Sequence, residues 1–124
     1  MLFRSGLPKR EKEALRIFEN LDAVLVAAGT DRSNLVRTDQ YYTTVKAVPP
    51  YQQVRREFLR GRIPPSTSIA QQRFLLPGAD MNIQAMAAIG GKDFTVEHLK
   101  HEQLQGRPTS GYSAAVTVDR KSVV

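Results

Sequence analysis

Two neighbouring histidines are the residues whose types and spacing most resemble a reactive centre. His98 and His101 stand three positions apart, with Glu97 and Glu102 beside them. On a helix this spacing would put both imidazoles on one side, where they could begin a metal site. Because the chain has no cysteine and no other histidine, only a carboxylate could supply the third ligand that zinc needs. We therefore interpret the pair as surface histidines, and we predict no metal site and no cofactor.

Other motifs that could carry chemistry are incomplete. Gly90-Gly91-Lys92 is too short for a phosphate-binding loop, which needs a longer glycine-rich pattern that ends in Gly-Lys-Ser or Gly-Lys-Thr. Neither histidine lies beside a Gly-x-Ser-x-Gly turn, which disfavours a serine hydrolase. The absence of cysteine excludes a thiolate nucleophile and a disulfide framework. These residue types alone name no reaction.

Arginines gather between positions 55 and 62, in a chain with a formal net charge of +6 and a sequence pI near 10.0. An RNA-binding surface would add exposed aromatic rings for base stacking, but the spacing of Tyr51 and Phe58 is typical of buried residues. A solvated helix face therefore explains the arginines better than a nucleic-acid site, which stays the alternative. The cluster consists of Arg55, Arg56, Arg60 and Arg62.

The elements that must position these residues begin with a helix over 9–28. Its apolar residues recur at spacings of three and four, and Gly29 follows as a stop signal. This stripe must pack on something larger, such as one face of a sheet. The stripe is made of Ala14, Ile17, Phe18, Leu21, Val24, Leu25 and Ala28.

The following segments alternate between strand and helix signals. β-Branched and aromatic residues predict a strand over 35–45, and Pro49-Pro50 opens a second helix that ends near Gly61. Segments 66–76 and 81–89 are predicted as strands that pair in a hairpin across the turn at 77–80. This order predicts an α+β fold in which both helices pack on one face of a mixed sheet.

The last third of the chain is less regular. We interpret 93–110 as a polar linker with one short helical or extended piece. Segments 114–118 and 122–124 are predicted as a short strand and the start of another, joined by a turn at 119–121. The length of 124 residues suits one compact domain, and no apolar run approaches the roughly 20 residues of a membrane span. Charged residues follow Pro8 at once, unlike a secretory signal, so we expect a cytoplasmic protein.

Several motifs follow one another in a distinctive order between residues 14 and 89. The helix Asn20-Leu21-Asp22-Ala23-Val24-Leu25 runs to Ala28-Gly29, and Val36-Arg37-Thr38 follows. Later come the turn Leu76-Pro77-Gly78 and the strand Ile83-Gln84-Ala85-Met86-Ala87. In order and spacing these motifs closely resemble the RidA/YjgF family of reactive intermediate deaminases, which has Val-Lys-Thr in the first strand and usually Ile-Glu-Ala-Ile-Ala in the second.

The two ends resemble the family in the wrong order. Gly111-Tyr112-Ser113 is similar to the opening of the family's first strand, yet it lies near the C-terminus, so 111–124 resembles the family's N-terminal strand. Ser5-Gly6 is similar to the end of the second strand, yet it lies at the N-terminus. We therefore expect 1–124 to be a single RidA-like domain with a shifted start. A circular permutant and a segment of a tandem protein both fit this pattern.

The resemblance implies a mixed sheet of about six strands with two helices on one face, assembled as a homotrimer with small-molecule pockets in the clefts between subunits. In active relatives, an arginine on the strand after the second helix binds the substrate carboxylate, and a glutamate on the last strand handles the water that hydrolyses an imine. Thr67 stands at the arginine position, or Ser66 or Ser68 if the alignment shifts by one residue. Asn82 stands at the glutamate position, and Gln84 replaces another acid.

These replacements imply that enamine or imine deaminase activity is altered or lost. The expected function is binding of a small metabolite, with an RNA-binding or endoribonuclease-type member as one alternative and a structural role in a larger fused protein as another. No membrane association is expected. The implied ligand-binding residues are Ser5, Gly6, Thr67, Ser68, Asn82, Gln84 and Tyr112.

Overall fold

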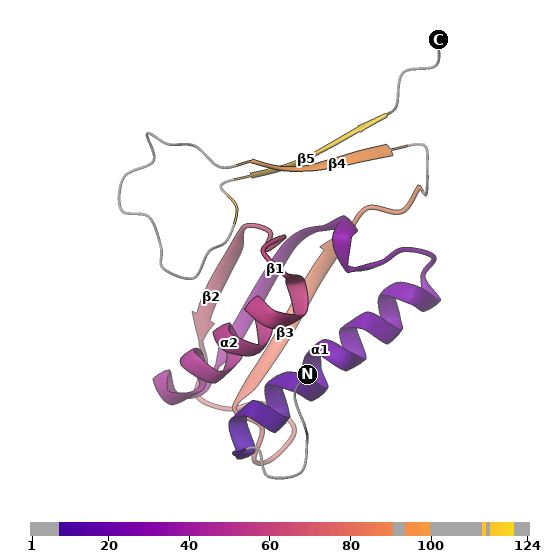
Figure 1. Cartoon of the computed structure of the whole chain (residues 1–124). Helices are drawn as coiled ribbons and strands as arrows, with labels where there is room; N and C mark the ends of the chain where they lie inside the picture. The colour runs from indigo at the N-terminus through magenta and orange to yellow at the C-terminus, as the bar shows by residue number, and fades with distance from the viewer. Residues whose placement is uncertain (1–7, 91–93, 100–112, 114, 121–124) are drawn as a thin grey trace.

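The computed structural model describes residues 8–90, 94–99, 113 and 115–120 of the chain (Figure 1). In order, its elements are the helix α1 (Lys9–Ala27), the 3-10 turn η1 (Arg32–Asn34), the strand β1 (Leu35–Tyr42), the 3-10 turn η2 (Val45–Ala47), the helix α2 (Val48–Leu59), and the strands β2 (Ser66–Ala70), β3 (Met81–Ala87), β4 (Phe94–Leu99) and β5 (Ala115–Arg120). The predicted residues Ser5, Gly6 and Tyr112 lie outside the described part of the chain.

Helix α1 confirms the strongest periodicity of the sequence. Phe18 and Leu25 are buried on its inner side, and Gly29 ends the helical turn with a φ of 84°, which favours glycine. The predicted stripe was too wide, because Val24 is 64% exposed. Successive helical residues are turned by about 100°, so the burial of Leu25 carries its neighbour Val24 away from the core. Ala28 is also exposed.

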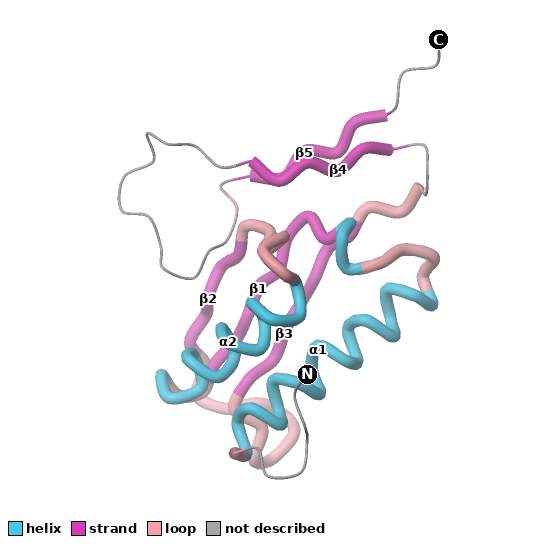
Figure 2. The backbone as a smooth tube through the Cα atoms, in the orientation of Figure 1, coloured by secondary structure: helices cyan, strands magenta, loops and turns pink. Residues whose placement is uncertain are grey.

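Strand β1 is the centre of a mixed three-stranded sheet with the order β2-β1-β3 (Figure 2). It pairs in parallel with β2 and antiparallel with β3. The predicted hairpin between segments 66–76 and 81–89 is therefore wrong, since both segments pair with β1. The chain between them passes the end of β1, where the Gln71 N–H donates to the Tyr42 carbonyl at 2.9 Å and the Thr43 N–H donates to the Asp80 carbonyl at 3.0 Å.

Three predicted strands are longer than the observed ones; β3 ends at Ala87, two residues before the end of the predicted strand 81–89. β1 ends at Tyr42 because Thr44 caps the turn η2, where its hydroxyl accepts the Lys46 N–H at 3.3 Å. β2 ends at Ala70, and the rest of segment 66–76 belongs to the connection that passes the end of β1. Residues 43–45 and 71–76 have strand-like side chains. A strand nevertheless ends where its backbone no longer pairs with a neighbouring strand.

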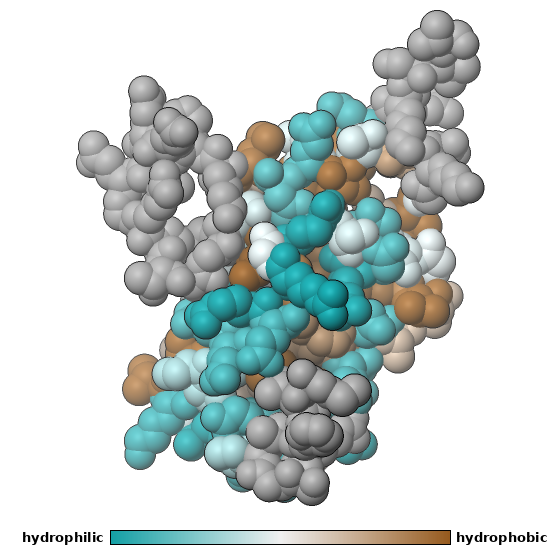
Figure 3. Space-filling model, viewed as in Figure 1, coloured by the Kyte–Doolittle hydropathy of each residue, from teal (hydrophilic) through white to brown (hydrophobic). Residues whose placement is uncertain are grey.

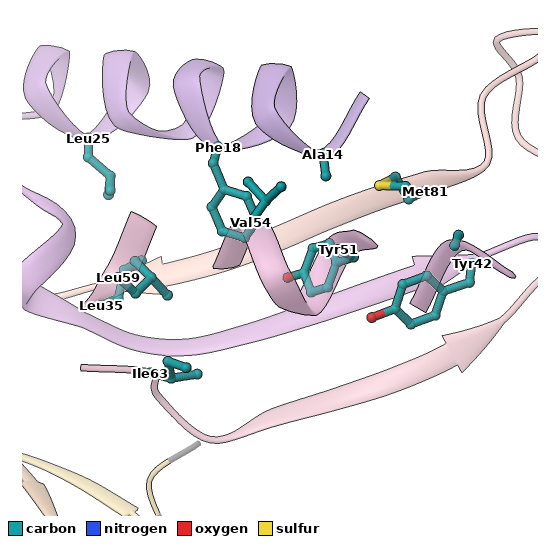
Figure 4. Close-up of a cluster of buried hydrophobic side chains, with 11 residues drawn as sticks. Ala14, Phe18, Leu25, Leu35, Tyr42, Tyr51, Val54, Leu59, Ile63 and Met81 are labelled. Carbon is teal, nitrogen blue, oxygen red and sulfur yellow. The ribbon is translucent and has the colours of Figure 1, made fainter. Parts of the chain in front are cut away.

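Both helices cover the same face of this sheet, and the core lies between them and the strands (Figures 1 and 4). Phe18 of α1 packs against Tyr51 and Phe58 of α2, with ring centroids 5.4 and 5.3 Å apart. The α+β class and the two helices on one face are thus confirmed. The buried hydrophobic residues are Ala14, Phe18, Leu25, Leu35, Tyr42, Ala47, Tyr51, Val54, Leu59, Ile63 and Met81.

Strands β4 and β5 form a separate antiparallel pair, with Val96 opposite Val118. The described strands therefore form sheets of three and two strands, in place of one sheet of about six. β4 is the extended piece of segment 93–110, whose remaining residues from 100 onward lie outside the described part. β5 continues through Asp119 to Arg120, so the turn predicted at 119–121 is wrong. Antiparallel pairing with β4 keeps these polar residues extended.

Candidate functional site

The face of the three-stranded sheet that the helices leave uncovered carries three of the four predicted site residues that the structure describes. Paired residues on neighbouring strands point the same way. Asp39 pairs with Thr67 on one side and Gln84 on the other, while Tyr41 pairs with Ile69 and Asn82. We call this surface the open face; it consists of Arg37, Asp39, Tyr41, Thr67, Ile69, Asn82, Gln84 and Met86.

The structure brings three of the predicted site residues together. Thr67, Asn82 and Gln84 are all exposed on the open face. Ser68 is not among them, because it points to the helical side of β2, where its hydroxyl accepts the Gln40 amide at 2.8 Å. Ser68 also hydrogen-bonds the hydroxyl of Tyr42, a group whose pKa burial raises to about 12. Ser68 therefore belongs to a polar network with Gln40 and Tyr42 on the helical side of the sheet.

Arg37 is the site residue that sequence reasoning missed. Its Nη2 atom donates to the Thr67 hydroxyl at 3.0 Å, and the same guanidinium forms an ion pair with Asp39 at 3.1 Å. A cation thus stands directly beside the position where the resemblance placed a lost arginine. Strand alternation puts Arg37 on the same face as Asp39, but its contact with Thr67 depends on the parallel pairing of β1 with β2.

The remaining polar groups of the open face are amides and a phenol. The Tyr41 hydroxyl donates to Gln84 Oε1 at 2.9 Å, and Asn82 Oδ1 accepts the Ile83 N–H at 2.7 Å. Both amides keep their NH₂ groups as donors. The face therefore combines one guanidinium, one carboxylate and several neutral hydrogen-bonding groups, a set that can hold a small polar molecule but has no obvious general base besides Asp39.

One arginine of the cluster between positions 55 and 62 is buried and the other three are exposed. Arg55 is only 1% exposed, and its guanidinium carbon lies 5.5 Å from the centre of the Tyr51 ring. The interpretation of the whole cluster as a solvated helix face is therefore wrong for Arg55, whose long stem and planar group pack inside the core. Arg56, Arg60 and Arg62 are exposed.

The histidine motif does not form the helical pair that would bind a metal. His98 lies half-buried on strand β4, and its two ring nitrogens are buried with no hydrogen-bond partner in the described structure. Burial, and secondarily the charge of Arg62, lower the pKa of His98. His101 lies outside the described residues. Within those residues no cluster of three or more potential metal ligands occurs.

The sequence of this chain matches one known protein family. The family model described as endoribonuclease L-PSP matches residues 7–89, which include both helices and all three strands of the larger sheet. The chain belongs to this family. The endoribonuclease L-PSP family is the RidA/YjgF family, so the resemblance seen in the sequence is confirmed. No curated protein matches the chain.

Several solved structures share the L-PSP fold. A protein of unknown function from Pseudomonas aeruginosa is 26% identical, with a TM-score of 0.62 over 69% of this chain and 62% of the other. A candidate endoribonuclease from Thermotoga maritima is 23% identical, with a TM-score of 0.61 over 68% and 66%. A candidate endoribonuclease from Klebsiella pneumoniae is 20% identical, with a TM-score of 0.62 over 65% and 60%.

The chain thus spans 60–66% of the length of these three structures. At these identities the likeness is one of fold. Among the described residues, no helix has both the length and the apolar character that crossing a bilayer requires.

Proposed function

We propose that this L-PSP family member forms a homotrimer and binds a small metabolite with a carboxylate group, in a cleft between subunits that includes the open face. The observation that carries the proposal is the contact of Arg37 with Thr67. Guanidinium groups bind carboxylates through two parallel hydrogen bonds. Asp39 engages the Nε and Nη2 atoms of Arg37, but the side chain is 51% exposed, so a ligand carboxylate can approach its Nη1 edge.

The open face also supports assembly. Ile69 is 37% exposed and Met86 is 60% exposed, on a sheet face that no described helix covers (Figure 1). Apolar side chains on such a face gain free energy when a second layer removes them from water. A second copy of the sheet would supply that layer and would turn the shallow polar surface beside Arg37 into a cleft.

The same geometry argues for weak chemistry. Hydrolysis of an imine needs a group that takes a proton from the attacking water. An amide such as that of Asn82 cannot take up a proton near neutral pH, and the carboxylate of Asp39 is engaged by Arg37. The proposed protein therefore retains carboxylate binding and hydrolyses imines slowly or not at all.

Substitution of the guanidinium tests the proposal. Pyruvate is titrated into the wild type, Arg37→Met and the control Arg56→Met, with binding followed by NMR; both arginines are exposed. We expect Arg37→Met to weaken binding about tenfold or more and the control to leave it unchanged. In parallel, an amino-acid oxidase generates imines in the presence of the protein. Equal pyruvate binding by all three proteins, or keto-acid release far above the spontaneous rate, would contradict the proposal.

RNA binding is a second candidate, favoured by the exposed arginines at the end of α2 and by the endoribonuclease name of the family. The helical side is mainly hydrophilic (Figure 3). If RNA binds there, its affinity falls steeply with salt, and the double variant Arg56→Ala/Arg60→Ala loses it. Arg55 is unsuitable for this test because it is buried. Absence of RNA binding at low salt would eliminate this candidate.

A further inference from the structure

A groove on the helical side of the molecule is lined by α1 and by the residues just before β3. It has a volume of about 460 Å³ and runs between the first three turns of α1 and the segment that leads into β3. Figure 1 shows this segment beside the N-terminal half of α1. The volume falls within the range of small-molecule sites.

The floor and one lip of the groove are apolar. Ile17 and Met81 lie at its base, and Leu76 stands at the lip with 71% of its surface exposed. Pro77 and Ala79 continue the apolar lining along the same segment. An exposed leucine over a concave apolar surface gains free energy when a ligand covers it.

The other lip is basic. Lys9 and Arg16 are seven residues apart on α1, so two helical turns place them on one side, about 10 Å apart along the axis. Glu13 lies between them, but its carboxylate accepts the backbone N–H groups of Asp80 and Met81 at 2.8 and 3.0 Å. The two N–H groups hold this carboxylate against the segment, and the groove lining carries two positive charges and one negative charge.

The wall contacts also make the groove a fixed shape. Besides the Glu13 hydrogen bonds, Arg10 pairs with Asp80 at 3.2 Å and the Lys9 ammonium donates to the Gly78 carbonyl at 3.3 Å. These contacts hold α1 and residues 78–81 together in the absence of a ligand. A preformed groove binds without the cost of ordering its own wall.

We propose that this groove binds an amphipathic organic anion, a single carboxylate or sulfonate attached to an apolar chain of roughly ten carbons. The apolar chain lies over Ile17 and Met81 under Leu76, and the anionic group meets Arg16 or Lys9. None of the residues that line this groove belongs to the open face, so substitutions can test the two sites separately.

Decanoate is the probe that tests the site, with decanol and decyltrimethylammonium as neutral and cationic counterparts. Methyl NMR signals of Ile17 and Met81 should shift on addition of decanoate, while those of Ile69 and Met86 on the open face should not. We expect Arg16→Gln to weaken binding about threefold to fivefold, and Lys9→Gln/Arg16→Gln about tenfold. The matched control Arg56→Gln removes the same charge from α2 and should change nothing.

Three outcomes would overturn the proposal: no shift of the Ile17 and Met81 signals, equal binding of the cationic probe, or equal weakening by Arg56→Gln. Leu76→Ser adds a second check, because it changes an exposed side chain that contributes little to the fold. It should weaken decanoate binding and leave the melting temperature unchanged.

Discussion

At the scale of single residues, Arg37 changes how the substituted site is understood. Taken alone, Thr67 indicates a site without its cation. In the folded chain, Arg37 of the neighbouring strand donates to the Thr67 hydroxyl at 3.0 Å, so a guanidinium contacts this position. What the site lacks is a carboxylate that can act as a base, since Asn82 is an amide and Asp39 forms an ion pair with Arg37.

Asn82→Glu should therefore restore part of the expected imine hydrolysis. The new carboxylate would stand on the open face in the row of Tyr41 and could accept a proton from water. We expect keto-acid release from oxidase-generated imines to rise about tenfold or more. Asn82→Gln has the same length without a titratable group and should leave the rate unchanged. If both variants behave alike, position 82 has no part in catalysis.

His98 should make the β4–β5 pair sensitive to acid. Burial first, and Arg62 second, lower the pKa of His98 below its unfolded value near 6.5. The unfolded chain then takes up a proton that the folded chain resists, so stability is full above about pH 6.5 and falls as pH drops below that value. After correction for the intrinsic pH dependence of amide exchange, the protection of the β4 amides should fall as the pH drops below about 6.5. This loss of protection should disappear in His98→Phe and persist in His101→Gln; an equal response in both variants would contradict it.

At the scale of elements, the connection between β2 and β3 decides the topology. It passes the end of β1 through backbone hydrogen bonds at Gln71 and Thr43, and α1 then holds its last residues through Glu13. One carboxylate oxygen accepts two backbone N–H groups there, at 2.8 and 3.0 Å. A long-range side-chain contact thus starts β3 in its antiparallel register.

Glu13→Ala should destabilise the protein, because it leaves the Asp80 and Met81 N–H groups without their acceptor. We expect the free energy of unfolding in urea to fall by about 1–3 kcal/mol. The control Glu57→Ala removes an exposed glutamate from α2 and should cost far less. Equal losses in the two variants would show that the Glu13 hydrogen bonds contribute little.

At the scale of the whole molecule, the uneven covering of the sheet is the dominant feature. α1 and α2 cover one face of the sheet (Figure 2). On the open face, Ile69 and Met86 are exposed to solvent. The small β4–β5 pair joins the rest through Ser113, whose N–H donates to the Ile63 carbonyl at 2.7 Å. An open, partly apolar sheet face is a natural surface for association with further copies.

Ile69→Glu should therefore abolish the trimer without unfolding the subunit. The new charge would be buried if the open faces of subunits pack together, which is strongly unfavourable without a partner. Size-exclusion chromatography with light scattering should give a trimer for the wild type and a monomer for the variant. Val45→Glu, at a side chain 83% exposed in η2, is the matched control and should stay trimeric. A monomeric wild type would contradict the proposed assembly.

Local patterns predicted the elements well where one interaction dominates. The three-and-four spacing around Phe18 specifies α1, and Gly29 supplies the conformation that ends it. Alternation from Met81 to Ala87 specifies β3. Patterns failed where burial depends on how the elements pack: Val24 is exposed while its neighbour Leu25 takes the core position, and Arg55 is buried with its guanidinium against the Tyr51 ring.

The candidate site divides in the same way. Alternation along β3 places Asn82 and Gln84 on one face of a strand whatever its neighbours are. Ser68 and Thr67 alternate as well, but which of them faces the helices depends on the pairing of β2 with β1. The hydrogen bond between Arg37 and Thr67 joins residues 30 positions apart, and no local pattern contains it.

The sequence by itself determined the class of fold, the two helices, the central strand and the family, because these follow from local periodicity, turn residues and motif order. Only the tertiary structure decided the strand order β2-β1-β3, the open face and the place of Arg37 on it. The physical reason is that strand pairing joins backbone groups far apart in the chain, so the side chains that share a surface are chosen by the register between strands and not by their spacing within one.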